Sequence, residues 1–321
     1  MTDGGETGKR PGTMSPEQAV LILKRESRVR SGTVPHAIAG VAVGPRQSWL
    51  AGDEFLLRPD ECLAFHYARG QGITVARGDG ADAIAENLWL NGSVYAAMAA
   101  INGFLPFHAS AVAWDGRAVA FTGPGGAGKS TLIAALGARG FPMFCDDTLV
   151  LDIGGEGAPM AMPGHKRLKL TPAALALTGA ARQEEVGAQT GKFYAEPPGG
   201  DWQVPLPLGA LIFLEEGPDV SLRRISGHER FTRLQDDHYT ANIFARARNH
   251  TPAEAFATWA RLARAIPMLV FTRPRDEARF GEGVDAVAKA LRDGLMNEGP
   301  AAASGWTSPV LGANGTDRAK E

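Results

Sequence analysis

The sequence predicts an α/β fold with a mixed sheet, preceded by a small β-rich module. An apolar run, Arg117 to Thr122, leads into the glycine-rich stretch GPGGAGKST and then into a short apolar helix. Asp115-Gly116 separates that run from another apolar run before it. Short alternating runs, broken by Gly, Pro and Asp, fill most of residues 34 to 76, and one of them, Ala37 to Val43, is expected as a single strand. A strand, a loop and a helix in this order indicate a layered α/β domain.

The glycine-rich stretch fits the pattern G-x-x-x-x-G-K-[ST] at every fixed position. Backbone N–H groups can curve around a triphosphate only where no Cβ blocks the approach, and the helix that follows adds its positive dipole end. Lys129 is expected to reach the β and γ oxygens, and the Ser130 hydroxyl to bind Mg²⁺. The motif therefore predicts ATP and Mg²⁺ as cofactors. The candidate nucleotide contacts are Gly123, Gly125, Gly126, Ala127, Gly128, Lys129, Ser130 and Thr131.

The strand that enters this loop is predicted to be the second arm of a hairpin. Asp-Gly between two apolar runs is typical of a type I′ turn, so Ala109 to Trp114 should pair antiparallel with Arg117 to Thr122. This pairing brings His108 close to Gly123, although fifteen positions separate them. The sequence leaves two roles for His108 equally open: a structural residue at the end of a strand, or a functional residue of the site.

A pair of aspartates follows the loop and its helix. The predicted buried strand Phe141 to Cys145 ends in Asp146-Asp147, and Thr148 to Asp152 continues as a strand, which disfavours a simple turn. Carboxylates at the carboxyl end of a strand beside such a loop manage Mg²⁺ and the nucleophile. Adjacent strand residues point to opposite faces, so one carboxylate is expected to hold the metal while the other meets the substrate.

Together these residues resemble the P-loop kinases related to the C-terminal domain of HPr kinase/phosphorylase. The resemblance rests on His108, the Asp-Gly turn, the loop GPGGAGKS and Asp146-Asp147, and it covers Leu105 to about Asp152 well. It implies a P-loop kinase domain of the HPr kinase type, with a hairpin leading into the loop. It also implies catalytic roles: Asp146 as the base toward a serine hydroxyl, His108 in support, and Lys129 at the phosphates. The metal role falls on Ser130 with Asp147.

One departure bears on the acceptor. The glycine-rich run that follows the aspartates in HPr kinase/phosphorylases is absent, and Pro163 to Lys169 stands in its place. The pattern is more similar to the lasso peptide precursor kinases, which implies a serine of a peptide or protein as acceptor. The alternatives are HPr kinase/phosphorylase proper, a small-molecule kinase or ATPase, and a nucleotide-sensing module without turnover.

Length and spacing divide the 321 residues into four parts. Residues 1–30 are expected to be mostly flexible, with a short helix that begins at Ser15-Pro16. Residues 31–104 form the small β-rich and helical module, residues 105–297 the kinase domain, and residues 298–321 a flexible tail. Gln183 to Asp201, polar and rich in Gly and Pro, is expected to be a loop.

Net charge and hydropathy limit the classes of partner that the protein is expected to have. The net charge is −2 and the basic residues are scattered, which argues against nucleic acid. No apolar run reaches the ~18 residues of a membrane span, and the first residues lack an apolar leader, so a cytoplasmic protein is expected.

The densest cationic group is His165, Lys166, Arg167 and Lys169. A solvated strand face is favoured for it over contact with phosphates or an acidic substrate. The sequence is compatible with a homo-oligomer.

Overall fold

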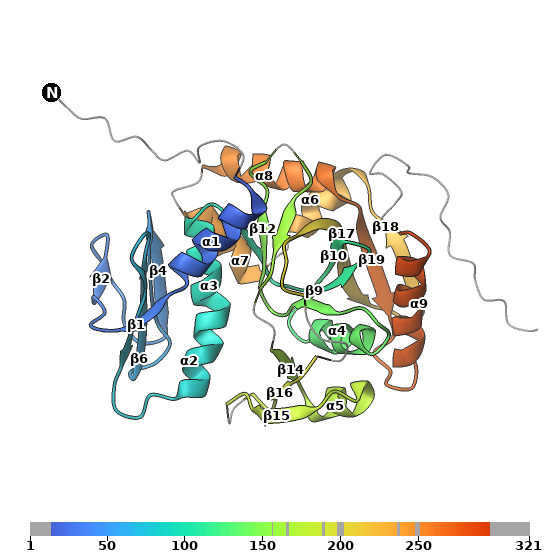
Figure 1. Cartoon of the computed structure of the whole chain (residues 1–321), viewed down its shortest axis with the longest axis horizontal. Helices are drawn as coiled ribbons and strands as arrows, with labels where there is room; N and C mark the ends of the chain where they lie inside the picture. The colour runs from blue at the N-terminus through green and yellow to red at the C-terminus, as the bar shows by residue number, and fades with distance from the viewer. Residues whose placement is uncertain are drawn as a thin grey trace, which may run out of the picture.

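A computed structural model describes residues 14–155, 157–164, 167–187, 190–197, 202–235, 238–247 and 251–295. The predicted tail at 298–321 and the first thirteen residues lie outside these ranges. Figure 1 shows a smaller sheet on one side, a larger sheet on the other, and helices between and around them.

The first helix of the described residues is α1 (Pro16–Glu26), whose start follows from its sequence. Ser15 caps it, and Gln18 completes a capping box with Ser15, as the Ser-Pro pair predicts. The five-stranded sheet that follows has the order β1-β7-β6-β5-β4. Its strands are β1 (Val29–Ser31), β4 (Gln47–Ala51), β5 (Glu54–Arg58), β6 (Leu63–Ala68) and β7 (Gly72–Arg77).

One predicted strand of this module is wrong in detail. The run Ala37 to Val43, expected as one strand, is a small hairpin of β2 (Ala37–Ile38) and β3 (Val41–Ala42). Ala39 and Gly40 turn the chain with φ of 48° and 77°. A left-handed pair of residues reverses the chain, so a continuous strand cannot form.

Helices connect the module to the larger sheet, as the apolar spacing predicts. They are α2 (Ala83–Trp89), the π-helical turn η1 (Leu90–Val94) and α3 (Tyr95–Ile101). α3 is buried along almost its whole length. One hydrophobic core runs from Leu23 and Phe55 through Met98 to Phe107 and Leu262. Residues of both sheets and of α3 therefore belong to one continuous core.

The larger sheet has nine strands in the order β11-β9-β10-β17-β13-β12-β8, with β19 beside β17 and β18 beside β19. They are β8 (Leu105–Phe107), β9 (Ala109–Trp114), β10 (Arg117–Thr122), β11 (Met143–Cys145), β12 (Leu149–Asp152), β13 (Met160–Met162), β17 (Leu206–Glu216), β18 (Ser221–Arg224) and β19 (Met268–Arg273). The predicted hairpin of β9 and β10 is confirmed, with Asp115 and Gly116 at φ of 47° and 66°.

The strand directions gather several chain segments at one edge of this sheet. β10, β17 and β19 run parallel, while β9 is antiparallel to both β10 and β11. The start of β9 therefore lies beside the carboxyl ends of β10 and β11. The carboxyl ends of β17 and β19 lie at the same edge.

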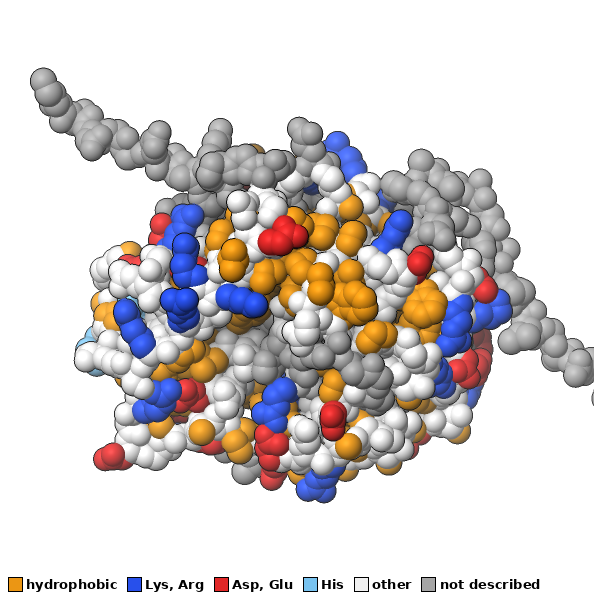
Figure 2. Space-filling model, in the orientation of Figure 1, with side chains coloured by type: hydrophobic (Ala, Val, Ile, Leu, Met, Phe, Trp, Pro, Cys, Tyr) orange, Lys and Arg blue, Asp and Glu red, His pale blue; other side chains and the backbone are white. Residues whose placement is uncertain are grey.

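The sheet is covered on both faces. Val119 and Phe121 of β10 pack with α4 (Lys129–Gly137) and α9 (Phe280–Arg292). Ala118 and Ala120, which alternate with them, belong to the core that contains α3, α7 (His238–Arg246) and α8 (Pro252–Ala265). This alternation is the period of two that a strand imposes. Lys and Arg side chains are interspersed with other residues on the face shown in Figure 2, without a single continuous basic surface.

A three-stranded sheet lies beyond α4, formed by β14 (Leu168–Leu170), β16 (Phe193–Ala195) and β15 (Arg182–Glu185), beside α5 (Pro172–Thr178). A loop was predicted over Gln183 to Asp201, and among the described residues this is wrong at 183–185 and 193–195, which lie in β15 and β16. β15 is polar and all four of its residues are exposed, whereas β16 contains buried residues. Polar strands with solvent on one side lack the apolar alternation that would reveal them.

Two helices, α6 (Gly227–Gln235) and α7, follow β18 in the chain. Asp236 and Asp237, between these helices, lie outside the described residues, as do His165 and Lys166. Among the helices that the structure describes, none combines the length and the apolar character that crossing a membrane requires.

Candidate functional site

The glycine-rich loop, Gly123 to Gly128, connects β10 to α4 at the edge described above. Gly126 and Gly128 have φ of 81° and 83°, a left-handed backbone that favours glycine. Lys129 starts α4, and its Nζ donates to the carbonyls of Gly123 at 2.8 Å and Pro124 at 3.2 Å. The lysine thus reaches back from the end of the loop to its beginning. The other predicted contacts, Gly125, Ala127, Ser130 and Thr131, lie in this loop or in the first turn of α4.

Asp146 lies against the first turn of α4. Ser130 Oγ donates to Asp146 Oδ1 at 2.9 Å, and Ser110 Oγ of β9 donates to the same oxygen at 2.5 Å. The side chain is buried, and no described residue hydrogen-bonds to its other oxygen, Oδ2. Because Cys145 pairs with Ala111, antiparallel register sets Asp146 opposite Ser110. The sheet register therefore fixes which carboxylate meets Ser130.

Asp147 faces different partners. Its Oδ1 lies 3.4 Å from His108 Nδ1, and its Oδ2 lies 2.7 Å from the ammonium of Lys169 on β14. His108 Nδ1 also lies 3.0 Å from the Asp147 carbonyl oxygen. The φ of Asp147 is 72°, so the chain turns sharply after β11. Asp147 is the more accessible carboxylate, with 28% of its side chain exposed.

The predicted partners of the two aspartates are exchanged. The resemblance implied Asp146 with His108 and Asp147 with Ser130, whereas the structure has Asp146 with Ser130 and Asp147 with His108. The reason is local: β11 ends at Cys145, Asp146 still follows the pairing with β9, and the left-handed turn at Asp147 redirects its side chain. The two carboxylates still occupy separate environments, as predicted.

The two carboxyl groups titrate in opposite directions. Burial, and then the charge of Asp147, raise the pKa of Asp146 above its usual range, despite the hydroxyl donors Ser110 and Ser130. Burial alone would also raise the pKa of Asp147, but the ammonium of Lys169, with smaller contributions from His108 and Lys129, outweighs it and lowers that pKa. Asp147 is therefore the carboxylate that stays ionised most readily.

The residues around Asp146 fit a magnesium ion. Mg²⁺ takes oxygen ligands and is usually held by one or two carboxylates together with phosphates and waters. Asp146 Oδ2 is a buried oxygen that lacks a partner among the described residues, and the Ser130 hydroxyl lies on the same carboxylate. Within the described ranges, no three His, Cys, Asp or Glu side chains form a metal cluster. The protein would thus supply only part of the ligand set.

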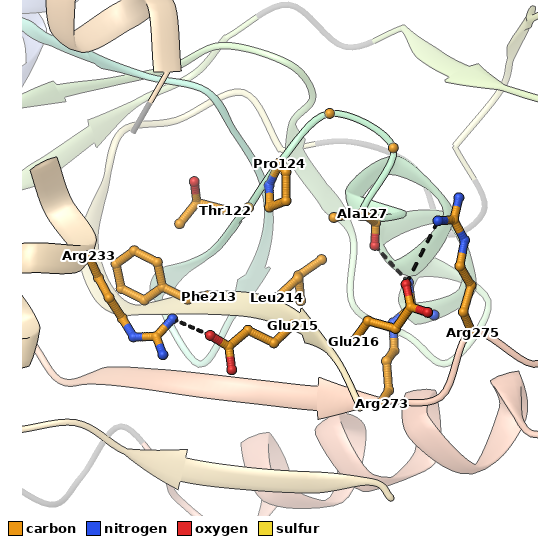
Figure 3. A pocket seen from close by; sticks show the side chains of 13 residues that line it. Thr122, Pro124, Ala127, Phe213, Leu214, Glu215, Glu216, Arg233, Arg273 and Arg275 are labelled. Carbon is orange, nitrogen blue, oxygen red and sulfur yellow. Dashed lines mark hydrogen bonds and ion pairs between the residues drawn. The ribbon is translucent and has the colours of Figure 1, made fainter. Parts of the chain in front are cut away.

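A cavity of about 630 Å³ opens beside the glycine-rich loop, between it and the ends of β17 and β19 (Figure 3). We call it the loop cavity. Glu215 pairs with Arg233 at 2.7 Å along one side. Arg273, at the end of β19, donates to the Ala127 carbonyl at 2.8 Å and so ties the loop to the sheet. The remaining lining residues are Thr122, Gly123, Pro124, Gly125, Gly126, Phe213, Leu214, Glu216 and Arg275.

Three residues of this site were not predicted. Ser110 lies two positions after His108, so the strand period alone could have placed it on the same face. Lys169 belonged to the group for which a solvated face was favoured, yet its side chain is 14% exposed and paired with Asp147. Arg273 follows an apolar strand far along the chain, and no motif marks it. Only the fold brings Lys169 and Arg273 to the loop.

Comparison with known proteins adds little to this geometry. No protein-family model matches the sequence, and no curated protein matches it. Among solved structures, the chain is similar to the HPr(Ser) kinase/phosphatase from Coxiella burnetii, at 15% sequence identity and a TM-score of 0.31. That similarity covers 60% of this chain and 91% of the other. A likeness at this level carries no argument about chemistry, so what the protein does must be argued from the site itself.

Proposed function

We propose that this protein is an ATP- and Mg²⁺-dependent kinase that transfers the γ-phosphoryl group to a serine hydroxyl of a peptide or protein. The observation that carries the proposal is that two adjacent carboxylates, Asp146 and Asp147, have different hydrogen-bonding and ionic partners. Ser130, in the first turn of α4, donates to Asp146, whereas Asp147, the more accessible carboxylate, lies beside His108 and Lys169. A plain nucleotide-binding module has no use for the second carboxylate.

The glycine-rich loop and Lys129 are proposed to hold the phosphates. An ammonium about 4 Å from a phosphate charge interacts by roughly 4 kcal/mol at an effective dielectric near 20. Lys129 bonds to carbonyls of Gly123 and Pro124 and can exchange these for phosphate oxygens. Ser130 and Asp146 would hold Mg²⁺, which would supply positive charge to offset that of the phosphates.

Asp147 is proposed as the base, in place of Asp146. The serine oxygen forms a bond to the γ-phosphorus, the bond from that phosphorus to the β,γ-bridging oxygen breaks, and ADP leaves with that oxygen. The hydroxyl proton passes to the Asp147 carboxylate. A positioned base contributes about 10²–10⁴-fold to such a step. His108 and Lys169 hold the carboxylate from two sides and keep it ionised.

The proposed acceptor, a serine of a peptide or protein, is taken from the resemblance to the precursor-peptide kinases. The alternative functions predict different results in a labelling experiment. A small-molecule kinase or ATPase, and a nucleotide sensor, could use the same loop. The test is incubation of the full chain with γ-labelled ATP, Mg²⁺ and serine-containing peptides, with the Asp147→Asn variant as control. Label on serine that Asp147→Asn lacks is the expected result. Free phosphate alone would replace the proposal with an ATPase, and neither product would indicate a sensor.

HPr kinase/phosphorylase proper is the remaining rival. It predicts that a serine-phosphorylated product is also cleaved by inorganic phosphate to give pyrophosphate. We propose the forward transfer alone, because the glycine-rich run typical of that family is absent after the paired aspartates. Release of pyrophosphate from a phosphorylated peptide and inorganic phosphate would contradict this choice.

A further inference from the structure

A second cavity, of about 650 Å³, lies between the N-terminal sheet and α7. We call it the module cavity. Its walls come from β4 and β5 of the five-stranded sheet, from the segment Trp89 to Ser93, and from α7. It therefore belongs to the junction of the small module and the larger domain, away from the loop cavity.

The lining of the module cavity combines apolar surface with positive charge. Phe55, Leu57 and Trp89 contribute the apolar part. Arg46 and Arg246 lie at the cavity, both exposed, and no carboxylate is among the described residues that line it. Arg246 also lies over the Trp49 ring at 5.5 Å. This combination suits a segment that carries apolar and acidic side chains.

The cavity lies along an open edge of the sheet. β4 ends the strand order β1-β7-β6-β5-β4, and among the described strands it pairs only with β5. Gln47, Ser48 and Leu50 of β4 line the cavity. The edge of a terminal strand offers backbone N–H and C=O groups to an added extended segment. A peptide can therefore bind here through its backbone as well as through its side chains.

The cavity is linked to the proposed base by a single turn. Ser93 lines the cavity, and the preceding residue, Gly92, lies near Asp147: a Cβ added to Gly92 would be 4.0 Å from Asp147 Oδ2. Gly92 has non-helical φ and ψ of −101° and −105° within η1. The chain therefore kinks at Gly92, between the two helices α2 and α3. The backbone that presents Ser93 to the cavity therefore passes Asp147 one residue earlier, at Gly92.

We propose that the module cavity binds the acceptor peptide, as an extended segment whose acidic and apolar side chains flank the reacting serine. This inference rests on the proposed function and adds the substrate class to it. Arg46 and Arg246 select the acidic residue, the apolar wall takes its neighbour, and η1 delivers the serine to Asp147. The N-terminal module is thereby the specificity element of the enzyme.

The test uses the full chain, γ-labelled ATP and a serine-centred peptide library in which one flanking position at a time is fixed as Asp, Lys or Leu. Wild-type protein is expected to favour Asp over Lys about tenfold at one or more positions. The double variant Arg46→Glu/Arg246→Glu is expected to reverse that preference. A matched control, Arg28→Glu/Arg264→Glu, changes the same charge at two exposed residues that do not line the cavity.

Nucleotide affinity, measured by calorimetry, separates this inference from the proposed function. It should be the same in all three proteins, because Arg46 and Arg246 do not line the loop cavity. Labelled peptides without a charge preference, or a preference that survives in the cavity variant or reverses in the control, would overturn the docking site alone. ATP binding without any labelled peptide would overturn the peptide acceptor. Absence of ATP binding by wild-type protein would overturn the proposed function itself.

Discussion

Ser130 Oγ donates a 2.9 Å hydrogen bond to Asp146 Oδ1, which joins the first turn of α4 to the residue that follows β11. This contact is the reason that we propose Asp146, rather than Asp147, for the metal side of the site. Asp147, one residue later, is left to His108 and Lys169. The consequence is a clear distinction between the two aspartates that mutation can test.

Asp147→Asn should retain ATP and Mg²⁺ affinity and lose phosphoryl transfer by at least about 10²-fold, because the amide cannot take the serine proton. Asp146→Asn should instead weaken the Mg²⁺ dependence of nucleotide binding, since a carboxylate ligand is lost. Calorimetry with and without Mg²⁺, beside a transfer assay, distinguishes the two variants. The opposite pattern would restore Asp146 as the base.

Lys129→Ala should weaken ATP binding, since the ammonium that spans the loop supplies its positive charge to the phosphates. Lys24→Ala is a suitable control, because Lys24 is an exposed lysine of α1. Calorimetry on both variants measures the effect. Unchanged affinity in Lys129→Ala would count against nucleotide binding at this loop.

Lys169→Met should move the acidic limb of the pH–rate profile toward neutrality. Lys169 is the main charge that lowers the pKa of Asp147, so its removal raises that pKa. The base acts only when ionised, and activity will then begin to fall at a higher pH than in wild-type protein. Measurement of kcat from pH 4 to 9 for both proteins locates the acidic limb of each pH–rate profile. A uniform loss of activity, with an unshifted limb, would mean that Lys169 acts on the phosphates instead.

Arg273→Ala should raise the KM for ATP more than it lowers kcat, because the arginine holds the Ala127 carbonyl and with it the curve of the loop. Arg273→Lys keeps a donor and should recover part of the affinity. Steady-state kinetics of both variants tests this positioning role. Equal losses in the two variants would favour direct contact of the guanidinium with the nucleotide.

Glu26→Gln tests a buried carboxylate outside the site. Glu26 accepts hydrogen bonds from Tyr67 Oη at 2.7 Å and from the Gly70 N–H at 2.8 Å. Burial alone would raise its pKa, but these donors, with Arg25, lower it. At pH 7 the substitution should cost about 1.5–3 kcal/mol, as for hydrogen bonds to a charged group.

The pH dependence of that cost follows from the direction of the pKa shift. A lowered pKa means that the unfolded state binds more protons than the folded state just below the unfolded value, about 4.3. The contribution of Glu26 is thus complete above that pH and is lost as pH falls through the folded pKa. Denaturation of both proteins at pH 7 and pH 3 should show the difference in unfolding free energy shrinking in acid. A constant difference would assign the cost to packing.

Local patterns were sufficient for most helices and for the hairpin. Ser15-Pro16 and Thr251-Pro252 each begin a helix with a capping box, and Asp115-Gly116 turns β9 into β10. Each signal acts within four residues, so the sequence carries it directly. The strands β15 and β16 were not predicted, because β15 is polar throughout and β16 is only three residues long, so neither shows a run of alternating hydropathy.

The sequence by itself determined the loop, the hairpin that presents it, and the presence of two carboxylates and a histidine near it. Tertiary structure alone decided which carboxylate meets which partner. That choice depends on the register of β11 against β9 and on one left-handed turn at Asp147, and neither is encoded in a local pattern. The approach of Lys169, Arg273 and Gly92 depends likewise on strands and turns far apart in the chain, because side chains meet there only after the sheets have paired.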